Sequence, residues 1–152
     1  MVDHSFHKLT LALETGEVTI KLRSDLAPGH VARIGELANE GFYDGVVFHR
    51  VIEGFMAQGG DPTGTGSGGS KRPDLKAEFS DEPHVRGVCS MARSNNPNSA
   101  NSQFFICFDD ADFLDGKYTI WGEVIEGMEH VDKLPKGEPP RKPGKIVSMR
   151  AV

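Results

Sequence analysis

The chain has 152 residues, of which 38% are hydrophobic and 26% charged, a size and composition typical of one globular domain with its own hydrophobic core. We therefore predict a single domain over residues 1–152. The 22 acidic residues outnumber the 17 basic ones and give a formal net charge of -5, which argues against general attraction to nucleic acid or to anionic membranes.

The N-terminal stretch MVDHSFHKLTLALETG carries charges where a signal peptide needs an apolar segment, and no later stretch has the long uncharged run of a membrane-spanning helix. A cytoplasmic location is expected. Cys89 and Cys107 each lie in an apolar run, which favours buried reduced thiols over a disulfide or a metal pair. The histidines lack ligand spacing with Cys or carboxylates, so we expect no metal and no cofactor.

The predicted elements begin with a β-hairpin over 8–23, where apolar and polar residues alternate around a turn at Thr15-Gly16. An amphipathic helix is predicted over 27–42, since Pro28 suits its first turn and Gly41 its end. Later apolar runs, separated by Gly, Pro, Asn and Ser, predict short strands at 46–52, 55–58, 87–92, 102–108 and 145–152. With a second short helix at 127–134, the pattern indicates a mainly β fold: a closed antiparallel β-barrel with the helices over its ends.

A glycine-rich stretch at residues 60–71, GDPTGTGSGGSK, matches the nucleotide-binding pattern G-x-G-x-x-G. That pattern binds phosphate where a helix follows, and here Pro73 and the lack of an apolar stripe argue against a helix. Ser70 also stands where a Walker sequence needs lysine. We therefore predict a flexible surface turn, with nucleotide binding as the weaker alternative.

Arg50 stands in the middle of the apolar run VVFHRVI, and an arginine within a strand is rarely buried without a partner. It either faces a cleft or forms a structural ion pair at the barrel rim, and the run alone leaves both open. In the next run, FMAQ, strand period places Met56 and Gln58 on one side and Phe55 on the other, unless a bulge intervenes. Period alone would make Phe105, in SQFFICF, a core residue.

Two longer motifs are more specific. In order and spacing, FHRVIEGFMAQGGD and SMARSNNPNSANSQFFICFDDADFLDGKYTIWGEV resemble the cyclophilin family of peptidyl-prolyl cis-trans isomerases, and the likeness extends over nearly the whole chain. The resemblance implies a closed eight-stranded antiparallel β-barrel capped by two α-helices, with an active-site groove on its outer surface. It assigns catalysis to Arg50 and Gln58. It assigns substrate binding to Phe55, Met56, Ala92, Arg93, Phe105, Phe113, Leu114 and Tyr118.

Some of these positions differ from many eukaryotic members, which have tryptophan before LDG and histidine after LDGK. Phe113 and Tyr118 stand there in this chain. Because Phe113 has no N–H to donate, we expect weakened affinity for cyclosporin-type inhibitors and retained turnover. Arg93 and Ser94 replace the small polar pair that is common after SMA.

Rotation about an X-Pro bond breaks amide resonance over a barrier of roughly 18 to 20 kcal/mol, and it needs no cofactor. A guanidinium at Arg50 can donate a hydrogen bond to the prolyl nitrogen, whose lone pair leaves conjugation only in the twisted state. Gln58 would orient the peptide carbonyl. The proline ring would be held as a fixed pivot by Phe55, Met56, Phe105 and Leu114.

A non-catalytic module that grips proline-containing segments, as a chaperone does, is the alternative. The same apolar groove would serve it, but capture of a proline ring needs no cation, so Arg50 together with Gln58 favours the enzyme. The expected partners are proline-containing peptides and unfolded or folding proteins, without nucleic acid or membrane. The chain is expected to be a monomer.

Overall fold

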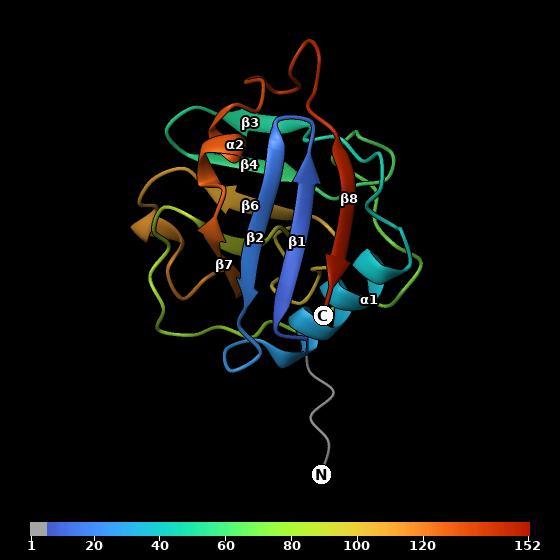
Figure 1. Ribbon diagram of the computed structural model, residues 1–152. Helices are drawn as coiled ribbons and strands as arrows, with labels where there is room; N and C mark the ends of the chain where they lie inside the picture. The colour runs from blue at the N-terminus through green and yellow to red at the C-terminus, as the bar shows by residue number, and fades with distance from the viewer. Residues whose placement is uncertain (1–5) are drawn as a thin grey trace.

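The computed structural model describes residues 6–152, so the first five residues of the charged N-terminal stretch lie outside it. Eight antiparallel strands form one curled sheet in the order β3-β4-β6-β5-β7-β2-β1-β8 (Figure 1). The strands are β1 (Lys8–Leu13), β2 (Gly16–Leu22), β3 (Arg50–Ile52), β4 (Met56–Gly59), β5 (Val88–Met91), β6 (Phe104–Cys107), β7 (Ile120–Glu126) and β8 (Ile146–Ala151). The helices are α1 (Pro28–Asn39), the 3-10 turn η1 (Asp112–Leu114) and α2 (Met128–Asp132).

The N-terminal hairpin and the first helix form where the sequence predicts them. β1 and β2 pair Leu9 with Ile20, and both side chains are buried. α1 begins at Pro28 and ends before Gly41, whose left-handed backbone (φ 79°) lets its amide bond back to the last helical turn. Within residues 6–152, no helix combines the length and apolar character needed to cross a membrane.

The sheet is curled but open, so the predicted closed barrel is wrong in this respect. Its edge strands β3 and β8 share no ladder, and nearby segments meet only through isolated bridges such as Val47 with Lys145. The predicted strand 46–52 is regular only in its last three residues, β3. In its earlier part, Val46 accepts a hydrogen bond from Ile146, the first residue of β8, and Phe48 donates one to Gly144. Gly144 belongs to the connection between α2 and β8, residues 133–145 (top of Figure 1), whose prolines lack the amide hydrogens of a continuous ladder.

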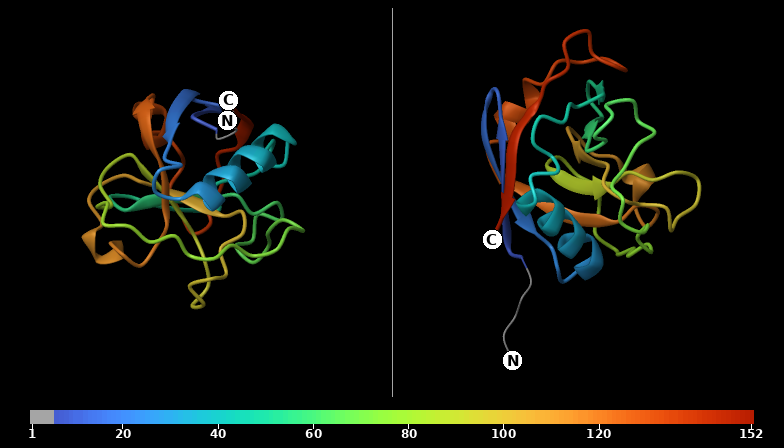
Figure 2. Two further views of the ribbon diagram at one scale, coloured as in Figure 1. Left: turned by 90° about the horizontal axis from the view of Figure 1, so that it is seen from below. Right: turned by 90° about the vertical axis from the view of Figure 1, so that its right-hand side faces the viewer.

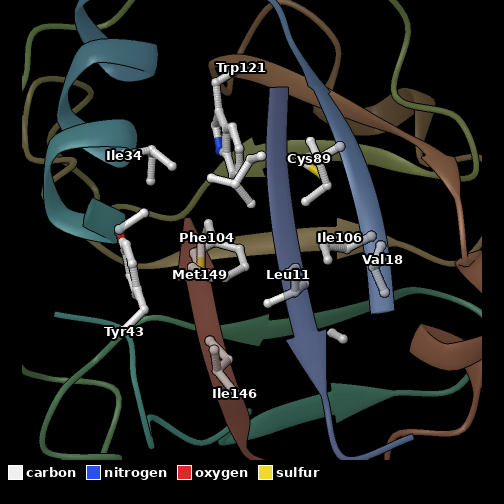
Figure 3. Close-up of a cluster of buried hydrophobic side chains, with 14 of the residues drawn as sticks. Leu11, Val18, Ile34, Tyr43, Cys89, Phe104, Ile106, Trp121, Ile146 and Met149 are labelled. Atoms are coloured by element: carbon white, nitrogen blue, oxygen red, sulfur yellow. The ribbon is translucent and has the colours of Figure 1, made fainter. Parts of the chain in front are cut away.

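The main core fills the interior of the curled sheet, with α1 lying across one end (Figures 2 and 3). The ring centroids of Phe104 and Trp121 lie 5.8 Å apart in an edge-to-face arrangement, and those of Phe104 and Tyr43 lie 5.6 Å apart. Cys89 and Cys107 are free and buried, as predicted, and burial raises the pKa of the Cys107 thiol to about 12.

Candidate active site

Strands β4 and β6 present alternate residues to the two faces of the sheet. Ala57 and Phe104 point into the main core, whereas Met56 and Phe105 belong to a second apolar cluster on the outer face. Period 2 therefore separates neighbours in the sequence into two environments, and Phe105 is not part of the main core.

A row of three side chains crosses the outer face. The strand pairing places Arg50 opposite Gln58, and Gln58 opposite Phe105. These residues border a hollow of about 170 Å³, which we call the outer groove. It is lined by nine of the ten predicted site residues: Arg50, Phe55, Met56, Gln58, Ala92, Arg93, Phe105, Leu114 and Tyr118.

Phe55 lines the groove although strand period placed it on the opposite face. It lies in the turn before β4, where its amide donates to the main-chain oxygen of Ile52 (3.0 Å), so strand alternation does not apply to it. Phe113, the tenth predicted residue, is 60% exposed and lies outside the lining. Its ring packs against Phe55 with centroids 5.5 Å apart, which places it at the rim.

A chain of hydrogen bonds forms the polar wall of the groove. Arg50 Nη1 donates to Gln58 Oε1 (3.4 Å), and Gln58 Nε2 donates to Gln103 Oε1 (3.0 Å). Gln103 Nε2 donates in turn to the main-chain oxygens of Gly66 and Gly68, each at 2.9 Å. The catalytic candidates are thus held by the glycine-rich stretch through Gln103, a residue the sequence did not single out.

Arg50 also forms an ion pair, so both alternatives that the sequence left open hold at once. Its Nε lies 2.9 Å from Glu138 Oε1, and the two side chains are 44% and 56% exposed. The guanidinium therefore borders the groove while one of its edges is occupied by a carboxylate.

The arrangement of an arginine and paired amides beside an apolar floor, on an eight-stranded antiparallel sheet, corresponds to a known family. The family model described as cyclophilin type peptidyl-prolyl cis-trans isomerase/CLD matches residues 8–151. This chain belongs to the cyclophilins. The predicted activity, cis-trans isomerisation of peptidyl-prolyl bonds, is thereby confirmed, and so is the enzyme class.

Relatives of this cyclophilin occur in bacteria and in animals. A probable peptidyl-prolyl cis-trans isomerase of Brucella suis is 58% identical over 138 residues, which cover 84% of this chain and 70% of that protein. Peptidyl-prolyl cis-trans isomerase-like 3 of Mus musculus is 43% identical over 132 residues, covering 84% and 81%. Among solved structures, a cyclophilin from Cryptosporidium parvum has a TM-score of 0.90 at 30% identity, covering 97% of this chain and 98% of its own.

The glycine-rich stretch of this cyclophilin is organised around one buried carboxylate, and no helix follows it. Asp61 is fully buried and accepts hydrogen bonds from the amides of Thr63, Thr65, Gly66 and Gly68. Burial alone would raise the pKa of Asp61, but these amide bonds outweigh it and hold the pKa well below its ordinary value. A Cβ at Gly68 would lie 2.2 Å from Asp61 Oδ1, so close packing requires glycine there. The stretch is a folded anchor for the groove wall and not the free turn that its composition predicts.

Arg93 separates the outer groove from a second hollow of about 480 Å³, and it lines both. Its guanidinium carbon lies 4.5 Å from the centroid of the Tyr118 ring, and its Nη2 donates to the main-chain oxygen of Lys117 (2.6 Å). Arg93 therefore forms a cationic partition between the two hollows.

A polar network, which no motif predicted, packs against Phe105 in the groove floor. His84 Nδ1 lies 3.0 Å from Asp115 Oδ1, and its Nε2 lies 3.0 Å from Ser90 Oγ. Burial lowers the pKa of His84 more than Asp115 raises it, so the ring is neutral at pH 7. It stacks on Phe105 with centroids 6.2 Å apart and planes 17° apart. His84 was missed because 21 residues separate it from Phe105 in the sequence.

Proposed function

We propose that Arg50 catalyses the isomerisation by donating a hydrogen bond to the prolyl nitrogen in the twisted state, while the outer groove holds the proline ring. The observation that carries this proposal is the common hollow: the guanidinium and the apolar side chains of Met56, Phe105 and Leu114 line the same space. The cyclophilin of Cryptosporidium parvum, 30% identical, was also solved in the presence of the dipeptide Ala-Pro. We propose that proline-containing peptides bind this chain in the outer groove.

The proposed roles follow from what changes along the reaction. In the planar amide the prolyl nitrogen lone pair is delocalised and accepts poorly, whereas at the top of the barrier it is localised. A donor that binds the twisted state better than the planar states lowers the barrier without lowering the ground state. Arginine suits this role because it stays charged at any working pH and its donors are fixed in one plane. Gln58 has a second Nε2 hydrogen with which it can orient the peptide carbonyl.

The test is substitution of Arg50 by alanine. Loss of one charged hydrogen bond in the transition state is expected to lower kcat/KM by about a hundredfold or more. Exchange spectroscopy on an Ala-Pro peptide measures turnover, and thermal unfolding measures stability, which should change little. Arg141→Ala removes an exposed arginine outside the groove and serves as the matched control. Undiminished turnover in Arg50→Ala would overturn the assignment.

We further propose that unfolded and folding chains are substrates, and that the protein acts as a cytoplasmic monomer. The two buried reduced cysteines support a reducing compartment. A refolding protein whose slow phase is limited by proline isomerisation distinguishes catalysis from holding. Wild type should accelerate that phase and Arg50→Ala should not, whereas a chaperone that only holds its client would suppress aggregation equally in both forms.

A further inference from the structure

We propose that Glu138 is a positioning residue for the reaction. It fixes the plane of the Arg50 guanidinium so that Nη2 of Arg50 can donate a hydrogen bond to the substrate. This inference rests on the proposed role of Arg50. Glu138 lies in the connection between α2 and β8, 88 residues away in the sequence, and is not part of the groove lining. Within residues 6–152, its carboxylate makes one hydrogen bond, which it accepts from Arg50 Nε.

The main chain presets the position of Glu138. The preceding residue, Gly137, exchanges two hydrogen bonds with Val51, both of 2.8 Å, and Val51 follows Arg50 directly in β3. A Cβ at Gly137 would lie 2.7 Å from Pro140 Cα, so the local bend of the connection at residues 137–140 requires glycine. Two prolines follow Glu138 and restrict the backbone further. A restrained main-chain segment therefore holds the Glu138 carboxylate beside β3.

Two contacts at different atoms define the orientation of the planar Arg50 side chain. Nε donates to Glu138, and Nη1 donates to Gln58. Among residues 6–152, Nη2 has no hydrogen-bond acceptor, so its two hydrogens are available. A side chain with four rotatable bonds would otherwise sample many orientations, and the Nε contact removes most of them.

The carboxylate also has an opposing effect, since a nearby negative charge reduces the positive potential offered to the substrate. Both side chains are about half exposed, so solvent weakens this Coulomb effect, whereas the hydrogen bond to a twisted amide depends steeply on direction. Orientation should therefore dominate, and removal of Glu138 should lower the rate. If the contact with Glu138 were inhibitory, removal of Glu138 would raise the rate instead.

The experiment compares Glu138→Ala, Glu138→Gln and a control. We expect about a fivefold loss of kcat in Glu138→Ala, with KM nearly unchanged, because the apolar floor that binds the ring is intact. Glu138→Gln keeps an acceptor oxygen and should recover most of the loss. Asp44→Ala breaks a similarly exposed pair, with Arg150, outside the groove and should leave turnover at the wild-type value. All variants are checked for unchanged thermal unfolding.

A spectroscopic readout separates positioning from general stability. The Arg50 Nε–H resonance should be displaced and should exchange faster with water in Glu138→Ala, while the main-chain amides of β3 stay in place. Unchanged or raised kcat in Glu138→Ala would overturn the proposal, as would an unshifted Nε–H signal. A double-mutant cycle tests whether Glu138 acts through Arg50: Glu138→Ala should have no further effect on turnover in the Arg50→Ala background. If Arg50→Ala itself retains full turnover, the proposed role of Arg50 fails first.

Discussion

The inner and outer faces of β4 and β6 are made by the same two short strands but are built differently. Inside, Ala57 and Phe104 are fully buried among apolar side chains. Outside, Phe105 and Met56 form a small apolar floor beside a wall of hydrogen-bonded polar groups, among them Gln58. One face excludes water on all sides, whereas the other leaves a hollow open to solvent.

This difference means that neighbouring residues contribute to different properties. Interior side chains contribute mainly to the free energy of unfolding, because truncating any one of them leaves an enclosed cavity. Groove side chains contribute mainly to the barrier of the reaction, because their free surfaces face the substrate. Substitutions at adjacent positions can therefore test the separation directly.

The largest expected effect comes from Phe104→Ala, compared with Phe105→Ala one residue later. Phe104→Ala should lower the free energy of unfolding by about 3–5 kcal/mol, since the cavity is enclosed. Phe105→Ala should cost less stability but lower kcat/KM by about tenfold or more, since the apolar surface that meets the proline ring is removed. Urea denaturation and peptide exchange measure the two quantities. If both variants lost the same free energy of unfolding and Phe105→Ala kept full activity, the inner and outer faces would not differ in the way described.

An intermediate effect is expected at Asp61, the buried anchor of the groove wall. Asp61→Asn should lower the free energy of unfolding by about 1–3 kcal/mol, because an amide cannot accept all the hydrogen bonds that the carboxylate accepts. Exposed Asp81→Asn is the control. Since folding depresses the pKa of Asp61, its contribution is present above the unfolded pKa of about 3.9 and is lost as pH falls through the folded value. Urea titrations from pH 7 to pH 3 should show a shallower acid loss in Asp61→Asn than in wild type.

The smallest effect is expected at the exposed rim, where Phe113→Trp adds an indole N–H. We predict that a cyclosporin-type inhibitor binds about tenfold more tightly to this variant, the value of one added hydrogen bond. Turnover of a small peptide should stay the same, because Phe113 lies outside the groove lining. Calorimetric titration measures the affinity. Unaltered affinity would mean that the rim does not contribute to inhibitor binding.

Local patterns predicted the elements whose burial is one-sided, such as the hairpin 8–23 and α1. They did not identify β7 as a strand, because its first residues, including Trp121 and Gly122, are buried on both faces and do not alternate. Register shifts in its ladders with β2 and β5 further blur the period.

The groove residues were predictable because two motifs carry them together. The residues that support them were not, since these meet only in three dimensions: Glu138 reaches Arg50 across 88 residues of sequence, and His84 stacks on Phe105 from a loop outside the strands. The sequence also did not predict that the sheet is open, because whether two distant edge strands pair leaves no local pattern.

The place of β8 in the sheet has a consequence for synthesis on the ribosome. β8 covers one edge of β1, and Glu138 reaches Arg50 from the connection that precedes it. Long-range pairing of this kind must wait until both partners have emerged. All nine prolines of the chain precede Ile146, the first residue of β8. Every prolyl bond of a new molecule is therefore synthesised before its own sheet can be complete, so a nascent chain cannot catalyse isomerisation of its own prolyl bonds at that stage.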